Sequence, residues 1–105
     1  MTVVKFLYDG KRLVGFCIEG HSTNDCDDVA GKTVCASVSS AAYMTANTIT
    51  EIIGDSCEIE VDDAKMFLKL KSISDASLKV LEGFKLHITE LSSQYSKRIR
   101  ITTEV

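Results

Sequence analysis

Five short segments that alternate apolar and polar residues set the strongest limit on how this chain folds. The segments are residues 2–8, 12–19, 57–62, 65–71 and 98–103. Alternation places the polar side chains of a strand on one face of a sheet, so this sheet needs helices on the other face only. The expected charged face comprises Glu58, Glu60, Lys65, Lys69, Lys71, Arg98 and Arg100. We interpret it as solvent-facing, with a contact to a partner as the alternative.

Two longer segments have the apolar spacing of amphipathic helices. Residues 33–53 lie between Thr33, a suitable N-cap, and Gly54, a suitable C-cap. Its predicted inward positions are Val34, Val38, Ala41, Ala42, Thr45, Ile49 and Ile52. Residues 75–95 form the second helix, capped by Ser74 or Asp75. The order ββαββαβ predicts an α+β fold over residues 1–105 as a single domain: a two-layer sandwich, with two helices on one face of a mostly antiparallel sheet.

Composition and charge exclude several classes of protein. A formal net charge of −3 and a pI near 5.3 argue against direct nucleic-acid binding, because such domains are usually basic. The chain has no apolar run long enough to cross a membrane, and its first residues lack the pattern of a signal peptide. We therefore expect a cytoplasmic protein with no membrane contact.

The four cysteines indicate free thiols. Cys17, Cys26, Cys35 and Cys57 form no C-x-x-C pair, so the sequence predicts neither a metal site nor a bound cofactor. Disulfides are rare in a reducing cytoplasm, where an unpaired cysteine usually acts as a small apolar residue. Cys26 and Cys35 flank one predicted loop, which leaves open a thiol-redox protein that joins them under oxidation.

Residues 20–32 form a polar loop that is longer than most connections, which favours a functional role. Gly31-Lys32-Thr33 is similar to the end of a phosphate-binding loop, but Cys26 stands where that motif has its first glycine. Asp25, Asp27 and Asp28 have part of the spacing of a calcium loop without its remaining ligands. We interpret both as ordinary loop and cap residues.

Cys35 and His21 are the candidate chemical groups. A thiol near a helix N-terminus lies where the helix dipole favours a thiolate, which is the nucleophilic form. His21, in the loop before that helix, is placed to accept the proton and return it. His87 lies inside the second predicted helix, where we expect it to pack at the boundary of the core. Since a single Cys and a single His are more often structural, these residues alone leave both interpretations open.

The motif around these two residues resembles a known family. Gly20-His21 together with Val34-Cys35-Ala36-Ser37-Val38-Ser39 resembles the signature of the ribosomal-processing cysteine protease family, Prp, which is roughly G-H-A-G-x-A-x-x-G-x-D-I-V-C-A-A-V-S. The resemblance implies that Cys35 is the nucleophile and His21 the general base. It also implies that Ser39 supports the thiolate or the substrate, and that Gly20 turns the backbone so that His21 points back.

The resemblance further implies a reaction and a partner. Members of the family remove a short N-terminal extension from large-subunit ribosomal protein L twenty-seven, and they are typically homodimers. This chain would then be a thiol protease acting on that precursor in ribosome biogenesis, with N–H groups at the start of the helix as an oxyanion hole.

The chain departs from the family pattern between the two catalytic positions. The interval from His21 to Cys35 is about two residues longer, and Lys32 stands where the family has an aspartate. Asp28 is a candidate replacement for that aspartate, and Lys32 is a candidate to hold the thiolate by its charge. The altered loop also supports an alternative, in which the same fold is a non-catalytic, ribosome-associated protein-binding module.

Overall fold

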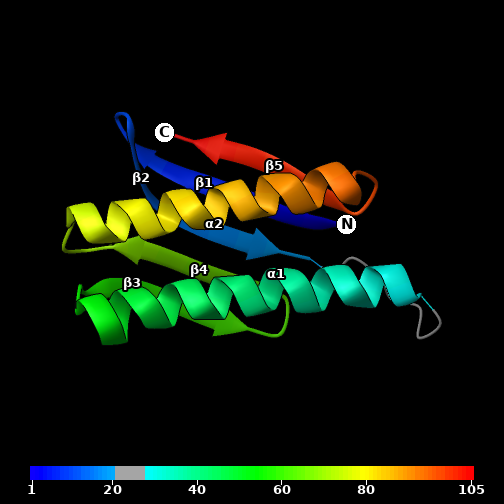
Figure 1. Ribbon diagram of the computed structural model, residues 1–105, viewed down its shortest axis with the longest axis horizontal. Coiled ribbons are helices and arrows are strands. Elements are labelled where there is room, and N and C mark those ends of the chain that lie inside the picture. Colours follow the sequence, from blue (N-terminus) through cyan, green and yellow to red (C-terminus); the bar gives the residue numbers. More distant parts are fainter. Residues whose placement is uncertain (21–27) are drawn as a thin grey trace.

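A five-stranded sheet forms one layer of the computed structural model, and two long helices lie side by side across one face of it (Figure 1). The structure describes residues 1–20 and 28–105. Its elements are β1 (Thr2–Asp9), β2 (Arg12–Glu19), α1 (Val29–Asn47), the π-helical turn η1 (Thr48–Ile53), β3 (Cys57–Asp62), β4 (Lys65–Leu70), α2 (Asp75–Gln94) and β5 (Ile99–Glu104). This confirms the predicted order ββαββαβ and the predicted two-layer α+β fold.

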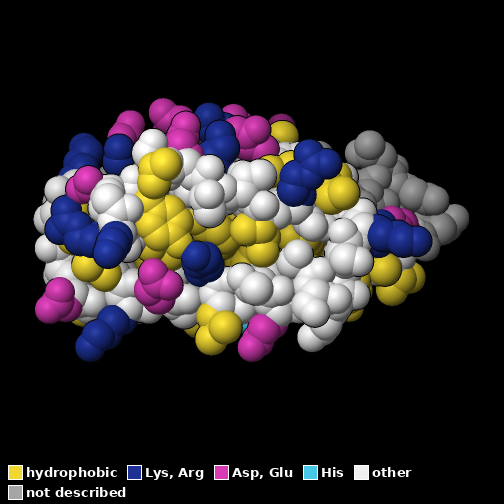
Figure 2. All heavy atoms as spheres, turned by 90° about the horizontal axis from the view of Figure 1, so that it is seen from above, with side chains coloured by type: hydrophobic (Ala, Val, Ile, Leu, Met, Phe, Trp, Pro, Cys, Tyr) yellow, Lys and Arg dark blue, Asp and Glu magenta, His cyan; other side chains and the backbone are white. Residues whose placement is uncertain are grey.

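The sheet has the strand order β3-β4-β2-β1-β5. Three of its pairings are antiparallel, and β1 with β5 is parallel. The sheet is therefore mostly antiparallel, as predicted. In Figure 2, Lys, Arg, Asp and Glu side chains gather along the border away from the helices, where the sheet faces solvent.

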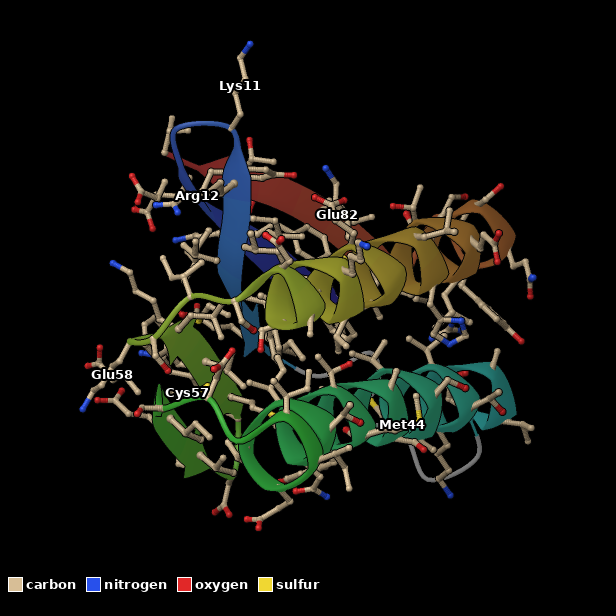
Figure 3. All side chains as sticks on the ribbon, turned by 60° about the vertical axis from the view of Figure 1, so that its left-hand side comes forward. Lys11, Arg12, Met44, Cys57, Glu58 and Glu82 are labelled. Atoms are coloured by element: carbon tan, nitrogen blue, oxygen red, sulfur yellow. The ribbon has the colours of Figure 1, made fainter. Side chains whose placement is uncertain are left out.

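The sequence predicts a tight β1–β2 turn with Asp9 and Gly10 as its two central residues, both with a positive φ. The turn in the structure differs from this prediction. β1 continues through Asp9, and Gly10 has a φ of 62°. In the described part of the chain, only glycine residues have a positive φ. Asp9 therefore lacks the positive φ that the predicted turn requires. The turn lies at Gly10 and Lys11, with glycine first, as a type II′ turn requires. Lys11 marks its tip in Figure 3.

Apolar side chains from the sheet meet both helices between the layers. The strands supply the alternate residues that the sequence pattern predicts, including Phe6 and Phe16 at 0% exposure. Phe84 of α2 packs against both rings, with its ring centroid 4.5 Å from that of Phe16 and 6.0 Å from that of Phe6. α1 contributes Val34 and Val38, which are also buried. This core holds α1 at a fixed distance from the sheet.

The helix α1 begins four residues before the position predicted for it. Asp28, not Thr33, is the N-cap, and its Oδ1 accepts a hydrogen bond of 3.0 Å from the N–H of Gly31. Thr33 lies inside the helix, where its hydroxyl donates to the carbonyl of Val29 at 2.9 Å. Gly31 is a poor helix former, which favoured a later start from sequence alone. The cap and the burial of Gly31 outweigh that preference.

The end of this helical segment widens into a π-helical turn. Gly54 closes it as predicted, with a φ of 86° and an N–H that donates to the carbonyl of Ile49, five residues earlier. The wider turn shifts the angular position of the residues that follow. Ile49 is buried, but Ile52, predicted to point inward, is 80% exposed, while Ile53 packs against the core.

Asp55, in the segment before β3, forms hydrogen bonds with the start of α2. Its Oδ2 accepts hydrogen bonds from the hydroxyls of Ser74 and Ser77, each at 2.5 Å. Ser74 is the N-cap of α2 and accepts from the N–H of Ser77. The hydrogen bonds from Ser74 and then Ser77 lower the pKa of the Asp55 carboxyl from its ordinary value.

We expect Asp55→Asn to lower the Tm of the protein by a few degrees at neutral pH. The ionised form of Asp55 is favoured in the folded state, so its stabilisation is fully present above the ordinary pKa of 3.8. It is lost as the pH falls through the lower, folded-state pKa. Thermal unfolding at pH 7 and in steps below pH 4 should therefore show a gap between wild type and variant that closes in acid.

The exposed Asp63 provides the matched control for this prediction. Asp63→Asn makes the same chemical change in the β3–β4 turn, and should leave Tm nearly unchanged at every pH. An equal effect of both variants would mean that net charge, rather than the serine contacts of Asp55, sets the stability.

Candidate active site

Cys35 lies in a small cleft beside α1. The cleft has a volume of about 170 Å³ and is formed by α1, the adjoining ends of β1 and β2, and the β3–β4 hairpin. Its lining residues are Thr2, Ile18, Gly20, Cys35, Val38, Ser39, Tyr43, Val61, Asp62, Asp63, Ala64, Lys65 and Met66. The thiol is half-buried, so the cleft shelters it and leaves it accessible.

One face of α1 supplies a row of side chains to this cleft. Ser39 and Tyr43 follow Cys35 at intervals of four residues, which places all three on one side of a helix. The structure thus brings Ser39 to the cleft that holds Cys35, as the sequence predicts. Val38 is buried beneath the row and holds this part of the helix against the core.

Cys35 is the seventh residue of α1, because the helix begins at Val29. The unpaired N–H groups and most of the dipole effect belong to the first turn of a helix. The prediction that Cys35 stands at the helix start is therefore wrong. An oxyanion hole formed by the first N–H groups of this helix stays an untested expectation. Within α1, the N–H of Cys35 points to the carbonyl four residues earlier.

Gly20 brings the end of β2 to the same cleft. Its φ is 83°, and a Cβ at this position would lie 2.6 Å from the carbonyl oxygen of Met1. Its N–H donates to the carbonyl of Ala64 at 3.0 Å, which links it to the β3–β4 hairpin. Only glycine fits this conformation and this space. The predicted backbone turn at Gly20 is thus present, directly before His21 in the sequence.

Four residues that the sequence singles out lie outside the described residues: His21, Asp25, Cys26 and Asp27. The structure accordingly does not test the Cys35–His21 pair or the alternative of a Cys26–Cys35 disulfide. Within residues 1–20 and 28–105, Cys17, Cys35 and Cys57 form no disulfide with one another.

Asp28 and Lys32 are placed away from the cleft lining. Asp28 caps α1, and its Oδ2 also accepts from the guanidinium of Arg98, just before β5. Arg98 therefore ties the start of α1 to the sheet instead of joining the charged face predicted for it. Lys32 is exposed in the first turns of α1 and is not among the residues that form the cleft. In the structure, Asp28 therefore stabilises the start of α1.

The other two described thiols are less suited to act as nucleophiles than Cys35, because the pKa of each is raised. Cys17 is 6% exposed, and burial, followed by its contact with Glu19, raises the pKa of its thiol. Burial and the nearby charge of Asp55 raise the pKa of the Cys57 thiol. A raised pKa lowers the fraction of thiolate at neutral pH, so these two cysteines act as packing residues.

The β3–β4 hairpin is the wall of the cleft that sequence reasoning missed. Val61, Asp62 and Asp63 line it, although they are far from Cys35 in the chain. The sequence gives no signal for this contact, because it arises from the order of strands in the sheet.

His87 is exposed and lies in a second hollow, a groove of about 820 Å³ between α1 and α2. Met44, labelled in Figure 3, lines the α1 side of this groove. Within residues 1–20 and 28–105, no three His, Cys, Asp or Glu side chains gather in a way that could hold a metal ion. No helix in that part of the chain has the length and apolar character needed to cross a bilayer.

Solved structures with the same fold include proteins of two bacteria. A structure described as an essential ribosomal processing protease Prp from S. aureus, in complex with a substrate peptide, matches with a TM-score of 0.84 at 18% identity, covering 99% of this chain and 100% of that chain. The same protein with a covalently linked product peptide gives a TM-score of 0.83 at 18% identity, with the same coverage. A protein of Streptococcus mutans gives 0.83 at 21% identity, covering 99% of this chain and 96% of that one.

The sequence itself matches a family profile along almost its whole length. No curated protein matches the chain. The profile of the family described as cysteine protease Prp, however, matches residues 1–100. A match of this extent includes β1 to α2 and every wall of the cleft around Cys35. The chain is a cysteine protease and belongs to the Prp family.

Proposed function

We propose that this protease removes the N-terminal extension of large-subunit ribosomal protein L twenty-seven, with Cys35 as nucleophile and His21 as general base and acid. The observation that carries the proposal is the cleft in which the half-buried Cys35 meets Gly20, the residue directly before His21. The S. aureus relative, described as a ribosomal processing protease with a covalently linked product peptide, supports both the substrate class and a covalent step.

The reaction is acyl transfer in two steps. The Sγ of Cys35 gives its proton to His21 and attacks the scissile carbonyl carbon, so that the carbonyl oxygen takes the electron pair. Collapse of this intermediate breaks the C–N bond, and His21 protonates the leaving amine. Water then attacks the thioester while His21 accepts a proton from it, which releases the carboxylate product and restores the thiol.

Ser39 is proposed to support this chemistry from one turn along α1. Its hydroxyl lines the same cleft and is exposed, so it is available to donate to the substrate or to the thiolate. The floor of the cleft, formed in part by Val38 and Met66, is apolar and limits the water around the sulfur.

We further propose that residues 1–105 act as one domain, as a homodimer in the cytoplasm, on a protein substrate and without nucleic-acid contact. The acidic net charge supports the last point. The family resemblance supports the dimer.

A cleavage assay tests the proposed function. We expect the full chain to cut a synthetic peptide that spans the extension and the first residues of the mature ribosomal protein, at one bond, as seen by mass spectrometry. A peptide that begins at the mature N-terminus should remain intact. If the chain binds the longer peptide but leaves it uncut, the result would instead support a non-catalytic binding module.

A further inference from the structure

We propose that the edge strand β3 binds the substrate as an added β-strand and selects a segment that alternates basic and apolar residues. The inference rests on the proposed function, because it places this segment on the path to Cys35. It adds a specificity-determining surface outside the cleft.

β3 has a free edge. It is the outermost strand of the sheet and pairs with β4 on its inner side. Five of its six residues are exposed, and only Cys57, at its start, is half-buried. The backbone N–H and C=O groups on the outer side of such a strand are available to an extended peptide.

The free edge leads into the cleft. Val61 and Asp62, the last residues of β3, form part of the wall around Cys35. A peptide paired along β3 would therefore reach the wall of the cleft that holds the thiol. At about 3.3 Å per residue, the length of β3 accommodates a segment of roughly six residues.

The two faces of β3 differ in chemistry. Ile59 and Val61 are 42% and 51% exposed and share the register of the buried Leu68 and Met66 of β4, so they lie on the helix side. The alternate residues Glu58, Glu60 and Asp62 lie on the open side of the sheet. An added strand would match this pattern with apolar residues on one side and cationic residues on the other.

The lysines of β4 do not cancel this preference. Lys69 is opposite Glu58 and Lys65 is opposite Asp62, while Glu60 is opposite Phe67. An added strand would lie about 4.8 Å from β3 and about twice that distance from β4. The interaction of two charges weakens with distance and with solvent screening. A charge on the added strand would therefore interact more strongly with the acidic residues of β3 than with the lysines of β4.

Acidic residues on an edge strand have a second explanation, because charges there also prevent two sheets from joining. If the acidic residues serve only to prevent such joining, β3 needs no ligand and has no preference for a peptide that alternates basic and apolar residues. The two explanations therefore predict different results for peptide binding.

The test uses the full chain with Cys35→Ala, which prevents cleavage, and fluorescent five-residue peptides of sequence Lys-Val-Lys-Val-Lys and Glu-Val-Glu-Val-Glu. We expect fluorescence polarisation to show at least about tenfold tighter binding of the basic peptide at low salt, and a smaller difference in 0.5 M salt. The backbone nitrogens of the peptide can be methylated at its odd-numbered or at its even-numbered positions. In an added strand every second N–H points at the neighbouring strand, so one of these two sets should weaken binding strongly and the other only a little.

Charge variants locate the binding surface. Glu58→Gln with Glu60→Gln should weaken binding of the basic peptide by about threefold for each charge removed. Glu82→Gln is the matched control, because Glu82 is an exposed acid on α2, away from β3 (Figure 3). It should leave the affinity unchanged.

Three results would overturn the inference. These are equal affinity for the two peptides, equal effects of the two methylation sets, and a dimer in which β3 of one copy pairs with β3 of another. Because the readout is binding, a chain that binds as expected but cleaves nothing would contradict the proposed function and leave this inference standing.

Discussion

Replacement of Cys35 by alanine is expected to reduce cleavage of the extension peptide by about 10³-fold or more. The variant keeps the cleft and loses the sulfur that forms the thioester, so no acyl-enzyme can accumulate. Single-turnover assays with excess enzyme, followed by mass spectrometry, measure both the cut peptide and the acylated protein. Alanine is smaller than cysteine and suits a helix interior, so α1 should remain intact.

Cys57→Ala is the control for this experiment. Cys57 is a half-buried thiol at the start of β3, far along the strand from the residues that line the cleft (Figure 3). Its loss should leave the rate of cleavage within about twofold of wild type. Undiminished cleavage by Cys35→Ala would exclude the thiol as nucleophile.

His21 can be tested through the same assay. We expect His21→Ala to lose about 10²-fold in rate, which is less than the loss from Cys35→Ala, because a cysteine thiol keeps some reactivity without a base. The remaining activity should rise with pH as hydroxide replaces the imidazole. A rate equal to wild type would show that another group moves the proton.

The part of the site that could be predicted from the sequence is the part that lies within one element. Cys35 and Ser39 are four residues apart in a helical pattern, so their common face follows from helix geometry alone. The start of α1 could not be predicted in the same way. It depends on Asp28 and its contact with Arg98, seventy residues later in the chain, which no local pattern reveals.

The fold shows the same division. Alternation identified all five strands, because the period of two is a local property. It also assigned Arg98 to the charged face, whereas the structure pairs it with Asp28. The strand order was not predictable in this way, and it decides which strands are exposed. β3 and β4 have similar alternation, yet β4 lies between two neighbours and buries Met66 and Leu68, while β3 lies at the edge and exposes Ile59 and Val61.

Gly15 carries the largest expected effect on stability. It lies in β2, where β4 passes so closely that a Cβ at this position would be 2.2 Å from the carbonyl oxygen of Leu68 and 3.0 Å from the Cα of Lys69. Both atoms belong to the backbone, so no side-chain rotation relieves the overlap. Gly15→Ala must separate β2 from β4 or distort both, which would weaken the sheet at its centre.

We expect Gly15→Ala to lower the free energy of unfolding by at least about 3 kcal/mol, or to prevent folding. Gly83→Ala makes the same substitution in α2, where the added Cβ would meet no other part of the protein within 4 Å beyond its own turn of the helix. That variant should be about 0.5–1 kcal/mol more stable than wild type, because alanine favours a helix interior. Urea unfolding followed by circular dichroism measures both changes. If the two variants changed stability in the same direction, then the close approach of β2 and β4 would not be what requires glycine at position 15.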